Sequence, residues 1–239
     1  QDAEAQFARE EAELVDTLER LKRRVRDNRE SLETIERHFA LKNTMGYSLN
    51  AFVDYDSPLD IFMHLLVASE GTLAFIAEAV LRTVDVPRLK TTTIAVYPTL
   101  DAATRSLPAL FDSQAATLEL MDSRSIAVGR TFDSVPEQIT GFELSGQAAL
   151  LIEYHANETE QLRELEQAGS KLLADLDLET PAAFTTDAAE AAKAWAFRKG
   201  LYAQVAEARP SGTTALLEDI AVPVGDLADT CGGLQQLFD

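Results

Sequence analysis

The stretch from Ala68 to Leu73 has residue types suited to holding a ligand. It reads Ala-Ser-Glu-Gly-Thr-Leu and brings hydroxyl groups, a carboxylate and a glycine close together in the chain. Because Gly71 has no Cβ, backbone N–H groups in such a turn can approach an anionic or planar ligand closely. Many turns between a helix and a strand need a glycine for their conformation alone, so both interpretations are open at this point.

The histidine, cysteine and acidic residues offer few groups for metal binding or nucleophilic chemistry. His38, His64 and His155 lie far apart in the sequence, and His64 falls in an apolar stretch where a hydrogen-bonded core histidine is expected. Glu153 and His155 share a face of one predicted strand and give two metal ligands at most, so we predict a solvated strand face there. Cys231 has no basic neighbour to lower its pKa, which predicts an unreactive thiol.

Composition and charge exclude several classes of protein. The chain has 239 residues, of which 40 are acidic and 21 basic, giving a formal net charge of −19. This charge repels nucleic acid and anionic membranes, and no apolar run is long enough to span a bilayer. The acidic residues occur in every segment, which fits a solvated surface that keeps the protein soluble but favours a surface adapted to high salt. A single cysteine excludes an internal disulfide and a self-contained iron–sulfur cluster, so we expect a cytoplasmic protein.

The first forty residues predict a helical segment. Apolar residues spaced three, four or seven apart form one stripe: Phe7, Leu14, Leu18, Leu21, Val25, Leu32, Ile35 and Phe39. Asp27 and Glu30 resemble a capping box that restarts a helix after Asn28, and two helices or one bent helix fit the pattern equally well. The pattern fits a helical hairpin packed on its own domain and also fits a coiled-coil helix that binds a partner.

Residues 41–88 change from irregular to helical to extended. Residues 41–57 are rich in turn formers. Ser57 precedes Pro58 and predicts an N-cap for a helix over 58–67, which is almost entirely apolar and is therefore expected to be buried. The Ile-, Val- and Phe-rich stretch from Leu73 to about Val84 predicts an extended segment that ends before Pro87.

From residue 89 onward, strands and helices alternate. The pattern predicts an α+β fold in which helices cover one face of a sheet. The predicted strands are Thr91–Tyr97, Ala115–Met121, Ala148–His155, Ala182–Thr185 and Thr213–Val222. The predicted helices are Leu100–Phe111, Glu158–Leu176, Ala188–Ala208 and Asp226–Leu237. Pro136–Gly141 and Arg209–Gly212 are predicted loops.

Two segments carry a resemblance to a known family. Lys42–Ala51 and Leu66–Ile76 resemble the end of the FAD-binding domain of FAD-linked 2-hydroxyacid dehydrogenases, the group of glycolate oxidase, D-lactate dehydrogenase and D-2-hydroxyglutarate dehydrogenase. Asp54–Ile61 is most similar to large members that are fused to an iron–sulfur module. The resemblance continues more weakly through Glu119–Asp122, Trp195–Arg198 and Glu218–Pro223, so it covers about residues 30–239.

The resemblance implies a domain order and a set of site residues. Residues 1–40 would be a helical segment, 41–88 the C-terminal part of a vanillyl-alcohol-oxidase-type FAD-binding domain, and 89–239 an incomplete ferredoxin-like cap that covers the substrate. The implied FAD-binding residues are Asn43, Gly46, Tyr47, Ser69, Glu70, Gly71, Thr72 and Ile76. Arg198 would bind the substrate carboxylate, because a planar guanidinium can hold it with two parallel hydrogen bonds.

The implied activity is oxidation of a small D-2-hydroxy acid to a 2-oxo acid, with electrons passed through iron–sulfur clusters elsewhere in a longer chain to an acceptor. We therefore expect an internal fragment, with the pyrophosphate loop, the catalytic base and any metal ligands outside it. The family usually has glycine at the position of Ala68, and substrate-binding threonine and lysine near Tyr202 and Leu217. The alternative is a non-catalytic α+β module that binds a partner through its N-terminal helices.

Overall fold

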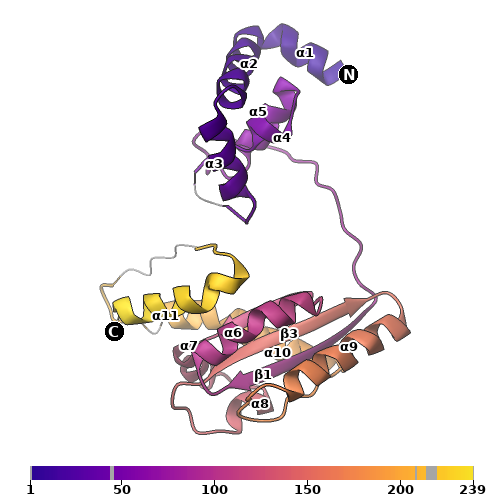
Figure 1. Cartoon of the computed structure of the whole chain (residues 1–239), viewed down its shortest axis with the longest axis vertical. Coiled ribbons are helices and arrows are strands. Elements are labelled where there is room, and N and C mark those ends of the chain that lie inside the picture. Colours follow the sequence, from indigo (N-terminus) through magenta and orange to yellow (C-terminus); the bar gives the residue numbers. More distant parts are fainter. Residues whose placement is uncertain (1, 44–45, 208, 214–219, 239) are drawn as a thin grey trace. The chain divides into compact units, whose positions relative to one another are not determined.

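A computed structural model describes residues 2–43, 46–207, 209–213 and 220–238. These residues fold as two compact units. The described residues up to Thr83 form the first unit together with Ile220 and Ala221, and the described residues from Val84 to Thr213 and from Val222 onward form the second. Figure 1 shows the helices of the first unit and the mixed helices and strands of the second.

The first unit is helical. Its helices are α1 (Asp2–Glu10), α2 (Ala12–Arg26), α3 (Arg29–Phe39), α4 (Ala51–Asp54) and α5 (Pro58–Leu66). Leu18 of α2 is buried against Phe52 of α4 and Ile61 of α5. The predicted helical character of the first forty residues is confirmed, and the described part of the segment contains three helices.

The helix starts follow local side-chain chemistry. Ser57 caps α5 by accepting a hydrogen bond from the backbone of Asp60, as predicted. The predicted capping box at Asp27 is wrong, because Asp27 has helical backbone angles and ends α2. Asn28 has extended angles instead and accepts the cap hydrogen bond from Ser31 N at 2.9 Å.

The burial predicted for α5 is only partly correct. Ile61 is fully buried, whereas Met63 on the same helix is 46% exposed. The reason is that α5 packs against α2 and α4 within the first unit through one face, which leaves the opposite apolar face uncovered.

The apolar stretch after α5 does not form a strand. Residues 73–87, all within the described part of the chain, belong to no helix or strand. Their large apolar side chains are exposed, with Phe75 at 92% and Val80 at 97%. A stretch rich in β-branched and aromatic residues forms a strand when a neighbouring strand pairs with its backbone. Within the described residues, no strand pairs with residues 73–87.

The second unit is built on an antiparallel sheet of β1 (Leu89–Tyr97), β2 (Thr117–Met121) and β3 (Ala148–Ala156). Their spatial order is β1-β3-β2, so the last strand in sequence lies in the centre. Thr92 of β1 and Thr117 of β2 both lie opposite Glu153 of β3. On the outer side of β1, Thr185 forms an isolated antiparallel bridge to Thr92, so the predicted strand Ala182–Thr185 is reduced to this one pair.

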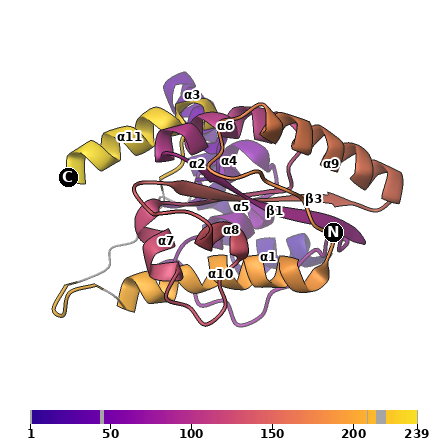
Figure 2. The same cartoon turned by 90° about the horizontal axis from the view of Figure 1, so that it is seen from below.

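Helices cover both faces of this sheet, which corrects the prediction of helices on one face. Figure 2 shows the sheet nearly edge-on between two helical layers. One layer contains α6 (Leu100–Asp112), α9 (Thr159–Ala174) and α11 (Leu227–Phe238); the other contains α7 (Ser123–Gly129), α8 (Glu137–Thr140) and α10 (Ala188–Glu207). The physical reason is in β3, where consecutive residues are apolar, so side chains that point to either face need cover.

Two further predictions for the second unit need comment. The predicted loop at Pro136–Gly141 contains the short helix α8, and α7 was not predicted. Of the predicted strand Thr213–Val222, residues 214–219 lie outside the described part, and Thr213 and Ile220–Val222 belong to no strand. A short 3₁₀ turn, Val224–Asp226, leads into α11.

Candidate functional site

The predicted ligand-binding turn has an unusual backbone. Ala68, Glu70 and Gly71 have φ angles of 61°, 51° and 74°, all in the left-handed region. Ser69 is buried, and its carbonyl oxygen accepts hydrogen bonds from the backbone N–H of Thr72 at 2.9 Å and from the Thr72 hydroxyl at 2.6 Å. Non-glycine residues rarely adopt positive φ, so this turn is held in shape by its own hydrogen bonds.

The structure brings the two resemblance-bearing segments together in the first unit. The hydroxyl of Tyr47 lies 2.9 Å from Thr72 Oγ1; because Thr72 donates its own proton to Ser69, Tyr47 is the donor. One residue further, the Ser48 hydroxyl donates to the carbonyl of Val67 at 3.0 Å. These two bonds join the segment after Lys42 to the turn after α5. We call residues 46–48 and 67–72 the turn cradle.

The turn cradle has open space beside it. Gly46 and Gly71 both have positive φ, and nothing among the described atoms lies within 4 Å of the position that a Cβ would take. Asn43 lies just before the cradle and is half-buried. Ile76 lies beyond it, in the segment without regular structure, and is exposed. The cradle therefore contains six of the eight predicted cofactor-binding residues, and Asn43 and Ile76 lie outside it.

Arg198 lies in the second unit, on α10. Its Nη2 is 2.8 Å from Glu119 Oε2 on strand β2, and the side chain is about one-third exposed. The Nε atom is buried and has no hydrogen-bond partner within the described ranges. A buried N–H without an acceptor is uncommon in folded proteins. The guanidinium is thus held by one carboxylate through Nη2, while its buried Nε has no acceptor among the described residues.

Glu153 forms a buried network next to α10 that sequence reasoning missed. Its residue exposure is 2%, so the predicted solvated strand face is wrong. Oε2 accepts hydrogen bonds from Thr92 Oγ1 at 2.7 Å and from Trp195 Nε1 at 2.8 Å. Oε1 lies 2.6 Å from His155 Nε2 and 3.8 Å from Lys90 Nζ.

The network keeps Glu153 charged. Burial acts to raise the pKa of this carboxyl, but hydrogen bonds from His155, Trp195 and Thr92, together with the charge of Lys90, outweigh it, so the pKa lies below its ordinary value. The sequence signal was one acidic residue inside an otherwise apolar strand. That signal cannot be interpreted without the register that sets Thr92 opposite Glu153.

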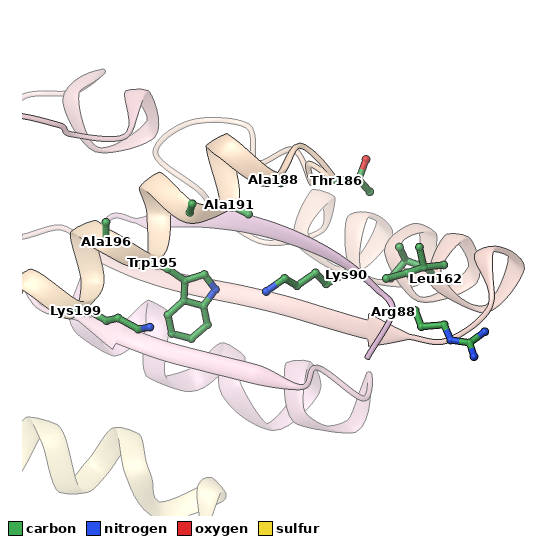
Figure 3. Close-up of a pocket in the computed structure, with 11 residues that line it drawn as sticks. Arg88, Lys90, Leu162, Thr186, Ala188, Ala191, Trp195, Ala196 and Lys199 are labelled. Carbon is green, nitrogen blue, oxygen red and sulfur yellow. The ribbon is translucent and has the colours of Figure 1, made fainter. Parts of the chain in front are cut away.

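A cavity of about 640 Å³ lies along the first half of α10. Its lining residues come from the start of β1, from α9 and from α10: Arg88, Leu89, Lys90, Leu162, Thr186, Ala188, Ala191, Ala192, Trp195, Ala196 and Lys199. Figure 3 shows the ammonium groups of Lys90 and Lys199 directed toward Trp195 from either side. We call this hollow the α10 cavity; no sequence motif predicted it.

The described part of the chain offers few other groups for nucleophilic chemistry or metal binding. His64 is half-buried, lies 2.7 Å from the carbonyl of Asp60 through Nδ1 and stacks on Tyr55, as expected for a satisfied histidine. Burial raises the pKa of the Cys231 thiol, in keeping with the predicted lack of reactivity. Within the described residues, no group of three or more His, Cys, Asp or Glu side chains could hold a metal ion. None of the described helices combines the length and the apolar character needed to cross a membrane.

Comparison with known proteins identifies the second unit. Residues 86–239 match the family "FAD linked oxidases, C-terminal domain". The chain belongs to this family. The FAD-linked oxidase domain thus includes both Arg198 and the α10 cavity, and the family resemblance expected from the sequence is confirmed.

Three curated relatives illustrate the similarity. The chain is 30% identical over 151 residues to a D-2-hydroxyglutarate dehydrogenase of Pantoea ananatis, covering 60% of this chain and 15% of the relative. It is 28% identical over 167 residues to the glycolate oxidase subunit GlcD of Bacillus subtilis (69% and 33%). It is 27% identical over 194 residues to a D-lactate dehydrogenase of Anaerostipes hadrus (79% and 37%). The FAD-linked oxidase chain therefore spans well under half the length of each.

Proposed function

We propose that this chain supplies part of the flavin site and the substrate-covering domain of an FAD-dependent enzyme that oxidises a D-2-hydroxy acid to the corresponding 2-oxo acid. The family of the second unit and the names of the three relatives, which all refer to 2-hydroxy acids, support the reaction class. In this proposal the electrons leave through iron–sulfur clusters in another part of the enzyme to an acceptor. The acidic composition with one cysteine supports a cytoplasmic location.

The strand order supports a ferredoxin-like cap in the second unit. A ferredoxin-like domain follows the order β-α-β-β-α-β. The second unit runs β1, α6, β2, β3 and α9, with α7 and α8 inserted between β2 and β3, and then reaches Thr185, which pairs with the outer side of β1. We assign residues 89–239 to the cap and 41–88 to the end of a vanillyl-alcohol-oxidase-type FAD-binding domain, preceded by the helical segment 1–40.

The exposed stretch at 73–86 supports a larger FAD-binding domain. Phe75, Val80, Leu81, Val84 and Val86 are all more than four-fifths exposed. Side chains of this size and β propensity are normally covered in a soluble protein. We infer that this stretch pairs with strands of the flavin domain that the 239 residues do not include.

The turn cradle fits one flank of a bound FAD. Gly46 and Gly71 leave open space where a Cβ would stand, and the Tyr47 hydroxyl bonds Thr72 Oγ1 within the cradle. We propose that the eight residues predicted from the resemblance hold the cofactor there. When bound, FAD supplies a two-electron acceptor for the hydrogen on the substrate α-carbon. The cradle itself contributes shape and hydrogen bonds, and no acid or base step is assigned to it.

The proposed substrate class depends mainly on Arg198. Every 2-hydroxy acid has a carboxylate next to the reacting carbon, and a guanidinium holds a carboxylate in a fixed plane. Glu119 fixes one edge of Arg198 while the buried Nε has no acceptor. We propose that the substrate carboxylate binds Arg198 and that this contact orients the α-carbon for oxidation.

The decisive experiment uses the full-length enzyme that contains this chain. Purified enzyme should show the absorbance bands of bound flavin, and D-2-hydroxyglutarate, D-lactate or glycolate should bleach them in the absence of an electron acceptor. The L-enantiomers of the first two acids are the matched controls. Absence of flavin, or flavin that no D-2-hydroxy acid reduces, would overturn the proposal.

A further inference from the structure

The α10 cavity has a charge opposite to that of the protein as a whole. The chain has 40 acidic and 21 basic residues, yet the cavity is lined by Arg88, Lys90 and Lys199 and by no acidic residue. Arg88 lies at one end with its guanidinium directed away from the indole, whereas both lysines reach toward Trp195 (Figure 3). A positive spot on a strongly negative surface concentrates small anions.

The carboxylate nearest to these lysines offsets part of the charge of Lys90 only. Glu153 Oε1 lies 3.8 Å from Lys90 Nζ, and the oxygens of Glu153 also accept hydrogen bonds from Thr92, Trp195 and His155. Asp187, at the start of α10, accepts the first free N–H groups of that helix. Lys199 has no carboxylate partner within the described ranges.

The cavity also has a rigid apolar wall. The hydrogen bond to Glu153 fixes the edge of the Trp195 ring, and Lys199 Nζ lies 5.6 Å from the ring centroid. Besides Trp195 and Lys199, the residues of α10 that line the hollow are alanines: Ala188, Ala191, Ala192 and Ala196. Alanines leave a flat surface, and Leu162 closes one side. The volume of about 640 Å³ is in the range of small-molecule sites.

We propose that the α10 cavity binds a small organic anion, with its carboxylate or phosphate group held by Lys90 and Lys199 and a flat apolar body against Trp195 and the α10 alanines. Two ammonium groups with an aromatic ring between them suit an oxyanion attached to such a body. The net charge of −19 disfavours a nucleic acid, whose many phosphates would meet the surrounding acidic surface. The cavity lies within the second unit, so this proposal does not rest on the proposed flavin site.

Trp195 is the only tryptophan in the sequence, so its fluorescence reports on this cavity alone. The 239-residue chain, with no FAD added, is titrated with benzoate, with phenyl phosphate and with benzamide, the neutral counterpart of benzoate. We expect a saturable change in Trp195 fluorescence with benzoate, phenyl phosphate or both, at an apparent Kd of about 1 mM or lower. A response to benzoate alone identifies a carboxylate ligand, and a response to phenyl phosphate alone identifies a phosphate ligand. A response to both indicates that the cavity binds either oxyanion.

Variants separate binding from nonspecific effects. Lys90→Gln and Lys199→Gln should each raise the Kd by about ten-fold or more, because each removes a charge-assisted contact. Lys193→Gln, on the same helix but outside the cavity lining, should leave the Kd unchanged. Thermal melts of all three verify folding. A response to benzamide equal to that of benzoate, an equal loss in Lys193→Gln, or no response to either anion overturns the proposal.

Discussion

Trp195 Nε1 donates a hydrogen bond of 2.8 Å to Oε2 of Glu153, and this contact ties α10 to the central strand of the sheet. Arg198 and Lys199 follow Trp195 within one turn of the same helix. A bond that fixes the rotation of α10 about its axis therefore also sets where these two cations lie. Glu153 thus holds Trp195 in the wall of the α10 cavity and helps to position Arg198, with which it makes no ion pair among the described residues.

Removal of the Glu153 carboxylate should destabilise the second unit. In Glu153→Ala, the Thr92 hydroxyl, the Trp195 N–H and the His155 ring lose their shared acceptor in a buried place. We expect a loss of about 2–5 kcal/mol in the free energy of unfolding, measured by urea denaturation followed by Trp195 fluorescence. Glu160→Ala, at an exposed position on α9, should change it by less than about 0.5 kcal/mol. Similar losses in both variants would contradict the buried role.

The same carboxylate should give the fold a distinct pH dependence. Its pKa is lowered in the folded chain, so it stabilises the fold above its ordinary value of 4.5, and this contribution disappears as the pH falls through the folded pKa. The difference in unfolding free energy between the wild type and Glu153→Gln should be largest near neutral pH. It should shrink steadily below pH 4.5 in urea titrations at several pH values. A difference that does not change with pH would contradict the prediction.

Ala68→Gly should stabilise the turn cradle. Ala68 has a φ of 61°, where its Cβ is strained and a glycine is not. Glycine also makes the unfolded chain more flexible, which offsets part of this relief. We expect the free energy of local unfolding to rise by about 0.5–1 kcal/mol, measured as slower hydrogen exchange of the α4 and α5 amides. Ala40→Gly is the matched control at φ −64°, and it should have the opposite sign. Faster exchange in Ala68→Gly would show that the backbone there is not strained.

Gly169→Ala tests the packing of α9 on the sheet. A Cβ at Gly169 would lie 2.6 Å from Cε2 of Tyr154, whose hydroxyl lies 2.6 Å from Ser113 Oγ. Tyr154 is fully buried and cannot move aside, so we expect a loss of about 1–3 kcal/mol in urea denaturation. Gly233→Ala in α11 meets open space and should instead be neutral or stabilising by up to about 1 kcal/mol.

Arg198→Lys tests the proposed substrate contact in the full-length enzyme. Lysine keeps the charge but loses the planar fork, so kcat/KM for the 2-hydroxy acid should fall about ten- to a thousand-fold. Flavin content and melting temperature should stay close to wild type. Arg163→Lys, at an exposed ion pair on α9, is the control and should keep full activity. Full activity in Arg198→Lys would reduce its role to the ion pair with Glu119.

Local signals in the sequence predicted the elements well. Apolar spacing identified the helical N-terminus, and Ser57 before Pro58 identified the start of α5, because both depend on neighbours in the chain. The boundaries of α6 and β3 also agree within two residues. The cap of α3 was misassigned by one residue because Asp27 and Asn28 can both cap, and only backbone angles decide between them.

Features that depend on tertiary structure could not be predicted. Burial of Glu153 follows from its pairing with Thr92 and from α10 lying over it, and neither is encoded in local spacing. The α10 cavity combines residues more than a hundred positions apart, such as Lys90 and Lys199. The contact between Tyr47 and Thr72 was not predicted: the family resemblance implied only that both residues bind FAD, and nothing in the two segments requires them to meet.

The segment from Leu73 to Val86 also makes the isolated chain easy to cut. Its backbone lies in no helix or strand, and it offers exposed Phe75 and Leu81 to chymotrypsin and exposed Arg82 to trypsin. Proteases need an accessible stretch of chain that can enter their active sites, and few other described segments combine length and exposure in this way. Brief digestion therefore provides a simple route to the second unit as a separate fragment, free of the helices that precede it.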